Sequence, residues 1–464
     1  MPHNGMQNIR FVYLLGVGGI GMSALARYFL AEGKIVAGYD RTETPLTKEL
    51  QKEGVQIHFE DSINLIPSNI QDLNNKENTL VILTPAIPST HAEFNFFKDQ
   101  NYQIVKRSKV LGLLTANQFT LAVAGTHGKT TTSSILAHIL HTAGMNCTAF
   151  LGGISVNIGS NLLLGNPSKP NHKVVVEADE FDRSFLALYP DLAIITSMDA
   201  DHLDIYGDHN QMKSTYQAFA NQVKPDGILL YKKGLPLNPI EATMMSYSIY
   251  DNEADYRGQN ITVKDGHYHF DLVTPGFILE DLTLGLPGRH NVENAVAASA
   301  LAIECGVDLI SLQESLASYS GVSRRFEFHI RNNNLVYLDD YAHHPEELRA
   351  AIQSVKELYP NNKITGVFQP HLYSRTRDFV DGFAESLSLL DKLYLLDIYP
   401  ARELPIEGVS SSMILDRAIL NDKQLISKED LIIELEKNKP EVLITLGAGD
   451  IDQLVLPITQ KLSA

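Results

Sequence analysis

The chain has 464 residues, of which 44% are hydrophobic and 20% charged, and at roughly 150 residues per domain this length suggests about three domains. Its formal net charge of 38 − 55 = −17 excludes a broad basic face, so we expect no nucleic-acid partner. The two cysteines, Cys147 and Cys305, cannot build a disulfide framework, which is typical of a reducing compartment. The first ten residues lack an apolar signal-peptide core, and glycines within the apolar residues 11–30 argue against a membrane span. We therefore expect a cytoplasmic protein without membrane insertion.

Residues 1–115 alternate short β-rich runs with helical stretches, which predicts a parallel α/β unit. Strands are expected at 11–16, 34–40, 79–87 and 102–107, and helices at 19–33 and 44–54, each closed by a glycine. The turn after the first strand matches G-x-G-x-x-G, the dinucleotide-binding fingerprint, with its glycines at Gly16, Gly18 and Gly21. A glycine turn before a helix suits any pyrophosphate, so the spacing alone leaves open NAD or another nucleotide diphosphate.

Residues 116–320 form a larger α/β block. Strands are expected at 119–125, 173–179, 192–199 and 226–233, an antiparallel insertion at 251–285, and an alanine-rich helix at 289–306. From residue 321 the alternation restarts, with the strand ends LVYLDDYAHHP, ITGVFQP, LYLLDIYP and VLITLGAGD. Such alternation implies parallel sheets with crossover helices. We expect three consecutive α/β domains at 1–115, 116–320 and 321–464.

A second glycine turn, GTHGKTTT, follows the strand at 119–125 and opens a helix. Glycines let backbone N–H groups approach phosphate oxygens, a lysine here reaches the β- and γ-phosphates, and the next hydroxyl binds Mg²⁺. Two residues separate the glycines, where the standard phosphate loop has about four. The alternative is a surface turn that happens to carry a lysine. We expect an ATP site made by Gly125, Thr126, His127, Gly128, Lys129, Thr130 and Thr131.

Two further strand ends offer ligands for divalent cations beside this turn. Glu177 ends the apolar run in VVVEADE, where its carboxylate would face the turn, and His202 follows the next strand in MDADHLD. Together with the Thr130 hydroxyl, these side chains would hold two metal ions for phosphoryl transfer to a carboxylate. The alternatives are a solvated strand end for Glu177 and a capping or loop histidine for His202.

Seven motifs stand in order along the chain: GTHGKTTT with its shortened turn, VVEADEFDRSF, DADHLD, GRHNVENAVAA, SRRFE, DDYAHHP and FQPHLYSRT. Together they resemble the Mur ligase family, ATP-dependent amide-forming ligases of cell-wall peptide synthesis. The resemblance covers nearly the whole chain. It implies an α/β fold of three domains with mainly parallel sheets, Rossmann-like at both ends and like the P-loop ATPases in the centre. It also implies that the first glycine turn binds the UDP portion of a sugar nucleotide.

The resemblance implies further binding residues. The UDP-sugar site would contain Gly18, Gly19, Ile20, Gly21, Met22, Asp40, Thr84, Pro85 and Arg107, although a solvated loop explains the basic pair Lys106-Arg107 nearly as well. Asn291 and Asn294 would contact adenine, with helix capping as the alternative. Arg325 would clamp the triphosphate and Asp340 would bind the ribose. The amino acid would contact Tyr341, His343, His371 and Arg375, with the arginine clasping its carboxylate.

The implied reaction joins L-alanine to the muramoyl carboxylate of UDP-N-acetylmuramate. The carboxylate attacks the γ-phosphate of ATP, and the alanine amine then attacks the acyl phosphate. The catalytic residues would be Lys129, His202, Arg325 and His343, with two Mg²⁺ ions, or Mn²⁺ in their place. The alternatives are a recycling ligase that adds a preformed peptide to the same sugar nucleotide and an NAD-dependent oxidoreductase. We expect a monomer or weak homodimer whose partners are these small molecules.

Overall fold

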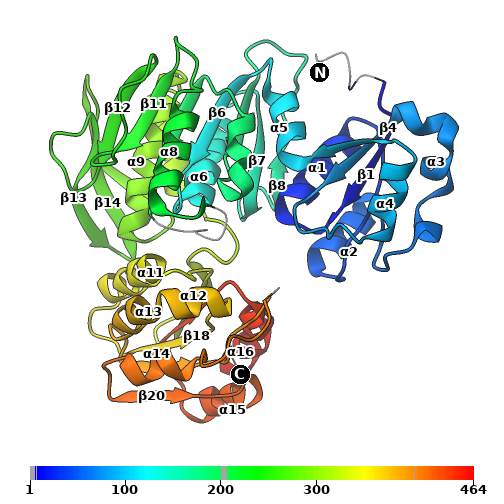
Figure 1. Ribbon diagram of the computed structural model, residues 1–464. Coiled ribbons are helices and arrows are strands. Elements are labelled where there is room, and N and C mark those ends of the chain that lie inside the picture. The colour runs from blue at the N-terminus through cyan, green and yellow to red at the C-terminus, as the bar shows by residue number, and fades with distance from the viewer. Residues whose placement is uncertain (1–5, 7, 200–205, 402, 464) are drawn as a thin grey trace. The chain divides into compact units, whose positions relative to one another are not determined.

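The computed structural model describes residues 6, 8–199, 206–401 and 403–463. Three β-sheets with helices between their strands make up the fold (Figure 1), and most of the strand pairs are parallel. This confirms the predicted α/β class. The chain divides into two compact units, which are described separately. The first comprises Met1–Arg257, Val273–Phe277 and Asn294–Ser315, and the second comprises Gly258–Leu272, Ile278–Glu293 and Leu316–Ala464.

The first sheet has five parallel strands in the order β3-β2-β1-β4-β5. They are β1 (Phe11–Leu15), β2 (Ile35–Tyr39), β3 (Gln56–His58), β4 (Thr79–Leu83) and β5 (Gln103–Lys106), with helices α1 (Ile20–Ala31), α2 (Pro45–Glu53), α4 (Ala92–Asp99) and α5 (Arg107–Thr115). The four predicted strands are confirmed, while β3 is a short addition and Arg107 begins α5 rather than ending a strand. Because β1 lies between β2 and β4, the turn after β1 occupies the switch point where α/β sheets bind ligands.

The second sheet has ten strands in the order β15-β14-β13-β12-β11-β10-β6-β9-β7-β8. They are β6 (Phe119–Ala124), β7 (Cys147–Ser155), β8 (Ser160–Leu163), β9 (Lys173–Glu177), β10 (Leu192–Ile195), β11 (Ile228–Lys232), β12 (Thr243–Ser248), β13 (Tyr256–Lys264), β14 (His267–Val273) and β15 (Ile278–Leu284). The main helices are α6 (Lys129–Thr142), α8 (His209–Ala220), α9 (Arg289–Glu304) and α10 (Leu309–Ser318). β6 pairs in parallel with β9 and β10, so the three strand ends meet at one edge. The turn Asp265–Gly266, positive in φ at both residues, joins the neighbours β13 and β14 as a hairpin, as expected for the insertion.

The third sheet has six strands in the order β16-β17-β21-β18-β19-β20. They are β16 (Glu327–Arg331), β17 (Val336–Asp340), β18 (Ile364–Phe368), β19 (Lys392–Leu395), β20 (Asp422–Leu425) and β21 (Val442–Leu446). The helices are α11 (Pro345–Leu358), α12 (Tyr373–Asp378), α13 (Val380–Leu387), α14 (Ser412–Arg417), α15 (Lys428–Lys437) and α16 (Val455–Ser463). Only β16 runs antiparallel to its neighbour. The ends of β17 and β18, from which DDYAHHP and FQPHLYSRT continue, lie on opposite sides of β21.

One hydrophobic core joins the first two sheets within the first unit. Helix α1 packs against β7 and β8 as well as against its own sheet, and the core includes Val12 and Leu25 together with Phe150 and Val174. The ring of Tyr28 lies 5.6 Å from that of Phe150. The helix that follows the first glycine turn is therefore fixed by packing from both sheets.

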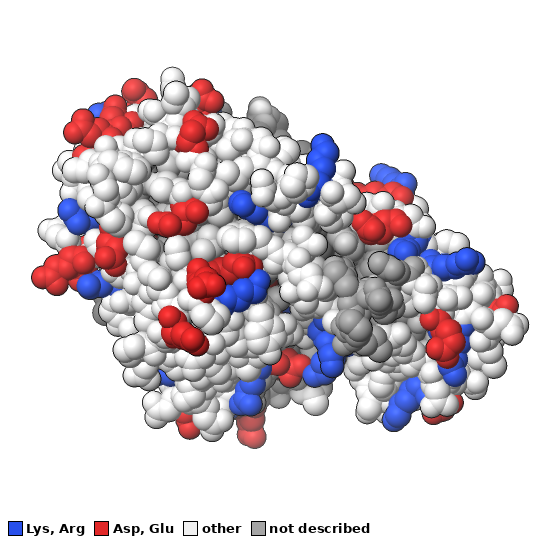
Figure 2. Space-filling view, turned by 90° about the horizontal axis from the view of Figure 1, so that it is seen from above, with Lys and Arg blue, Asp and Glu red and all other residues white. Residues whose placement is uncertain are grey.

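Two further observations concern the surface and hydrophobicity of the chain. Within residues 6–463, apart from the undescribed positions, no helix is long and apolar enough to cross a membrane. Figure 2 shows basic and acidic side chains interspersed on the face in view, without a continuous basic area.

Candidate active site

The first glycine turn is shaped by three side chains from neighbouring strand ends. A Cβ on Gly16 would lie 2.4 Å from Thr84, one on Gly18 would lie 2.9 Å from Asp40 Oδ2, and one on Gly21 would lie 2.3 Å from the guanidinium of Arg107. A Cβ on Gly16 or Gly18 would therefore collide with the neighbouring Thr84 or Asp40, whereas a Cβ on Gly21 would displace the flexible end of Arg107. The structure brings together Asp40, Thr84 and Arg107, all predicted for the UDP-sugar site, around the predicted glycines.

Hydrogen bonds from both sheets hold this turn and the first turns of α1. The Gly18 N–H donates to Asp40 Oδ2 at 2.8 Å. From β8, the buried Asn161 donates to the Ile20 carbonyl at 2.6 Å and to Ser23 Oγ at 2.9 Å. Its carbonyl oxygen accepts a 2.6 Å bond from Arg27. Asn161 thus uses both ends of its amide to fix one face of α1, a role that the sequence analysis missed.

The second glycine turn, Gly125–Gly128, is also closed by contacts that leave no room for a Cβ. On Gly125 it would lie 2.0 Å from Thr196 Oγ1, and on Gly128 it would lie 2.7 Å from Asn294 Oδ1. Gly128 has φ 82° and precedes Lys129, the first residue of α6. The His127 N–H donates to Ser197 Oγ at 2.8 Å. The turn has the strand, turn and helix order of a phosphate loop.

Lys129 lies inside this turn and is paired with an acidic group. Its ammonium donates to the carbonyls of Gly125 and Thr126 and forms an ion pair with Glu180 at 2.8 Å. Burial opposes the charge of Lys129, but Glu180, Glu177 and Asp179 raise its pKa above the usual value. Lys129 therefore remains a cation, held among backbone oxygens where phosphate oxygens could replace them.

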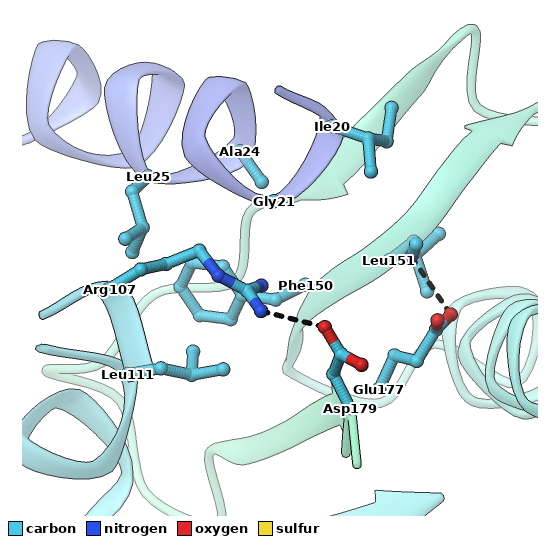
Figure 3. A pocket seen from close by; sticks show the side chains of 11 residues that line it. Ile20, Gly21, Ala24, Leu25, Arg107, Leu111, Phe150, Leu151, Glu177 and Asp179 are labelled. Carbon is cyan, nitrogen blue, oxygen red and sulfur yellow. Dashed lines mark hydrogen bonds and ion pairs between the residues drawn. The ribbon is translucent and has the colours of Figure 1, made fainter. Parts of the chain in front are cut away.

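A pocket extends from the start of α1 to the end of β9. Figure 3 shows residues from α1 and α5 on one side and from β7, the end of β9 and the segment after it on the other. Its lining comprises Ile20, Gly21, Ala24, Leu25, Arg107, Leu111, Phe150, Leu151, Gly152, Glu177 and Asp179. Three residues predicted for the sugar nucleotide, Ile20, Gly21 and Arg107, thus line one pocket with the predicted metal ligand Glu177. A ligand gripped at the first turn would extend toward the carboxylates beside Lys129.

Glu177, the predicted metal ligand, is the last residue of β9. Its Oε2 accepts a 3.1 Å bond from the Gly152 N–H, and a Cβ on Gly152 would lie 2.2 Å from that oxygen. His202, predicted as the second metal ligand, lies outside the described residues. Thr130 and Thr131 are nearly buried at the start of α6.

In the second unit, Arg325 and Asp340 lie close to Tyr341. The Arg325 guanidinium is 5.0 Å from the centre of the Tyr341 ring. Both carboxylate oxygens of Asp340 accept 2.8 Å bonds from backbone N–H groups, those of Phe326 and Ala342. Burial raises the pKa of Asp340 to about 7, although the Arg325 charge lowers it. The predicted ribose ligand therefore also organises the loop after β17.

The predicted amino-acid site is partly assembled. The rings of Tyr341 and His343 are 5.3 Å apart, and those of His343 and His371 are 6.2 Å apart. His343 Nδ1 lies 3.0 Å from the Tyr341 carbonyl and 3.2 Å from Glu347. Arg375 is buried in α12. Three of the four residues therefore form one aromatic and imidazole cluster.

The two asparagines predicted for adenine have different surroundings. The side chain of Asn291 donates to the Pro287 carbonyl at 2.6 Å, whereas Asn294 lies against Gly128 of the second turn. The former contact ties Asn291 to the segment before α9 through a donated bond, which is not an N-cap bond. The latter contact places Asn294 beside the phosphate turn.

Three family models match consecutive parts of the chain. The Mur ligase family catalytic domain matches residues 11–119, the Mur ligase middle domain 123–302, and the glutamate ligase domain of Mur ligases 324–449. The chain belongs to the Mur ligase family. The first glycine turn, the second and the cluster around His343 fall within one Mur ligase model each.

Individual Mur ligases resemble the chain over its whole length. The UDP-N-acetylmuramate–L-alanine ligase of Flavobacterium johnsoniae is 50% identical over 458 residues, covering 99% of both chains. The solved UDP-N-acetylmuramate-alanine ligase of Thermotoga maritima is 28% identical, with a TM-score of 0.80 over 97% of this chain and 99% of that one. A murein peptide ligase from Psychrobacter arcticus shares the fold, with a TM-score of 0.69 at 21% identity and 98% of each chain covered. The oxidoreductase alternative is not favoured.

Several residues at this Mur ligase site were missed. Asp179 and Glu180 stand in the quoted motif VVEADEFDRSF, and their position directly after Glu177 at a strand end was a usable signal. Gly152 and Phe150 carried no such signal, since both lie within the strand β7. Their place in the pocket depends on how the first sheet packs on the second.

Proposed function

We propose that the chain is an ATP-dependent ligase that joins L-alanine to the muramoyl carboxylate of UDP-N-acetylmuramate and releases ADP and phosphate. The observation that carries this proposal is the pocket that joins Gly21 and Arg107 to Glu177 and Asp179. A sugar nucleotide held at the first turn would extend along it toward the acidic segment whose next residue, Glu180, pairs with Lys129. A relative that is 50% identical and is named UDP-N-acetylmuramate–L-alanine ligase supports the choice of L-alanine and UDP-N-acetylmuramate as substrates.

In the first step, the muramoyl carboxylate would attack the γ-phosphate of ATP to give an acyl phosphate. Two anions must meet, so cations supply much of the catalysis. Lys129 would exchange its bonds to Glu180 and backbone carbonyls for phosphate oxygens. Arg325 would add a second positive charge.

Mg²⁺ fits the donors at this turn. Among the residues described, no three or more His, Cys, Asp and Glu side chains are grouped as a metal site. Mg²⁺ commonly uses one or two carboxylates together with substrate phosphates, and the Thr130 hydroxyl and Glu177 would hold it in that way. When bound, the ion would neutralise charge that develops on the phosphates. A second ion, at His202, is part of the same proposal.

In the second step, the alanine amine would attack the acyl carbon and phosphate would leave. Arg375 would clasp the alanine carboxylate, with Tyr341 and His371 beside it. His343 Nδ1 faces the Tyr341 carbonyl and Glu347, so Nε2 is the ring nitrogen that would receive the amine proton. Asn291 and Asn294 would contact adenine, and Asp340 the ribose.

This function assigns a role to each predicted domain. Residues 1–115 would bind the sugar nucleotide, 116–320 ATP, and 321–464 the amino acid. The enzyme would act in the cytoplasm, as a monomer or weak homodimer, in the synthesis of peptidoglycan precursors for cell-wall growth and division.

The deciding experiment measures ADP release with UDP-N-acetylmuramate, ATP and one amine substrate at a time. Turnover with L-alanine but not with a preformed tripeptide is expected. Turnover with the tripeptide alone would replace this proposal by the recycling ligase. Hydride transfer to NAD without any ADP release would instead support an oxidoreductase.

A further inference from the structure

An ion pair spans the pocket beside the first glycine turn. Arg107, the first residue of α5, places Nη2 2.9 Å from Asp179 Oδ2, two residues beyond Glu177 (Figure 3). The Arg107 side chain is 22% exposed and that of Asp179 is 36% exposed. Because the pair is partly shielded from water, its attraction exceeds that of a fully exposed pair.

The same guanidinium covers the first turn of α1. A Cβ on Gly21 would lie 2.3 Å from Arg107 Nη1. Backbone N–H groups at a helix start, together with a neighbouring arginine, are a suitable environment for a diphosphate. Arg107 therefore stands between two anions: the Asp179 carboxylate, which it already contacts, and the diphosphate expected at the first turn.

We propose that Asp179 is a specificity-determining residue that holds Arg107 until the diphosphate of a nucleotide substrate takes its place. This inference rests on the proposed function, because it requires a sugar nucleotide at the first turn. A ligand with a diphosphate replaces the ion pair with a stronger, bidentate one. A ligand without it must leave Arg107 on Asp179 and gains nothing from the guanidinium.

A second ion pair nearby provides a matched control. Lys106 Nζ lies 2.8 Å from Asp182 Oδ2, so this pair joins the residue before Arg107 to the third residue after Asp179. Lys106 is more exposed than Arg107, at 62%, and Asp182 is as exposed as Asp179, at 37%. Neither residue of this pair lines the pocket. If only the total charge mattered, removing Asp182 and removing Asp179 would have equal effects.

The test is calorimetric titration of the full-length protein with UDP-N-acetylmuramate, UDP and uridine, without ATP. Asp179→Asn keeps the Oδ1 acceptor for the Phe181 N–H but removes the charge. This variant should bind UDP-N-acetylmuramate and UDP about three- to tenfold more tightly, with unchanged affinity for uridine. Arg107→Met should lower the affinity for UDP-N-acetylmuramate and UDP by about tenfold or more. Adding Asp179→Asn to Arg107→Met should cause no further change in affinity. Asp182→Asn should stay within about twofold of the wild type.

Several outcomes would overturn the proposal. These are unchanged or weaker diphosphate binding by Asp179→Asn, an equal gain for uridine, or the same gain in the Arg107→Met background. A gain confined to UDP-N-acetylmuramate would show that Arg107 meets the muramoyl carboxylate instead of the diphosphate. Thermal unfolding of each variant, with Asp179→Ala as a second substitution, identifies losses due to misfolding. Absence of UDP-N-acetylmuramate binding by the wild type would contradict the proposed function itself, which is a distinct result.

Discussion

The two glycine turns share the order of strand, turn and helix but differ in backbone geometry and in the source of their cation. Gly19, before α1, has φ −66°, whereas Gly128, before α6, has φ 82°. In the first, Gly18 donates to Asp40 and the cation Arg107 comes from another element. In the second, the cation is Lys129, which begins the helix itself and is paired with Glu180. A turn that only grips a diphosphate needs N–H groups and space, whereas a turn at which phosphate is transferred needs a cation fixed beside it. The comparison therefore predicts separate losses when each turn is damaged.

The largest effect is expected for Lys129→Ala. ADP formation should fall by roughly 10³-fold or more, because the cation beside the transferred phosphate is lost. UDP-N-acetylmuramate affinity should stay within about threefold, because the first turn supplies that site. Coupled-enzyme assays and calorimetry measure the two quantities. If both were lost together, the division of labour between the turns would be wrong.

The next largest effect is expected for Gly152→Ala, which pushes a methyl group into the carboxylate of Glu177. The rate of ADP formation should fall by about 10- to 100-fold, and the Mg²⁺ concentration for half-maximal rate should rise. Gly276→Ala is the control, since a Cβ there has no atom within 4 Å. An unchanged Mg²⁺ requirement would remove Glu177 from the proposed metal site.

The third prediction concerns two buried carboxylates, Glu180 and Glu93, which lie in the two halves of the first unit. Burial raises the pKa of Glu180 to about 7 although Lys129 is its partner. Glu93 accepts a 2.6 Å bond from the Tyr13 hydroxyl and a 3.1 Å bond from the Ser62 N–H, and its Oε1 lies 3.4 Å from His58 Nε2. Burial raises the pKa of Glu93 to about 7. The folded state thus binds a proton more tightly than the unfolded state, so Glu93 stabilises the fold at low pH and this contribution is lost as pH rises from about 4.5 to 7.

The corresponding test is Glu93→Gln, studied by urea unfolding at pH 5 and pH 7.5. Between pH 5 and pH 7.5, the free energy of unfolding of the wild type should fall by about 2 kcal/mol more than that of the variant. Parallel pH dependence of the two proteins would mean that Glu93 has an ordinary pKa.

The smallest effect is expected for Asn161→Ala, which leaves Arg27 without one of its acceptors. The free energy of unfolding should fall by about 1–2 kcal/mol, since buried hydrogen bonds to a charged group are lost. The KM for UDP-N-acetylmuramate should rise while the KM for ATP stays constant, because only α1 is released. The control is Asn146→Ala, at a half-exposed asparagine before β7. It should lower the free energy of unfolding by less than Asn161→Ala does. Equal rises in both KM values would point to a general loss of structure.

The features that sequence analysis predicted best are those with local causes. Strand, glycine turn and helix follow one another within about twenty residues at both turns, and parallel strands bring their carboxyl ends to one edge. The resemblance assigned Asp40, Thr84 and Arg107 to one site, and the parallel sheet explains why these residues, far apart in sequence, lie together. The order of the Mur ligase motifs along the chain predicted which ligand each successive domain would bind.

What sequence analysis missed depends on contacts between sheets. Asn161 lies in an ordinary short strand, and only the packing of α1 on β8 gives its amide two partners on that helix. Asp179 stands in a quoted motif, yet its pairing with Arg107 depends on how α5 approaches β9. The short strands β3, β16 and β20 were missed because their sequences QIH, EFHIR and DKQL are rich in polar residues, whereas the equally short β1 and β10 are apolar runs. The roles of His202, His343 and Arg375 stay predictions.

The shared core around α1 limits how the molecule can be dissected. A fragment ending near residue 115 would expose the side of α1 that β7 and β8 cover, including Tyr28 and the guanidinium of Arg27. Such a fragment should aggregate or remain partly unfolded, even though it contains a complete five-stranded sheet. Studies of nucleotide binding by the amino-terminal part alone would therefore need to retain at least the β7–β8 hairpin.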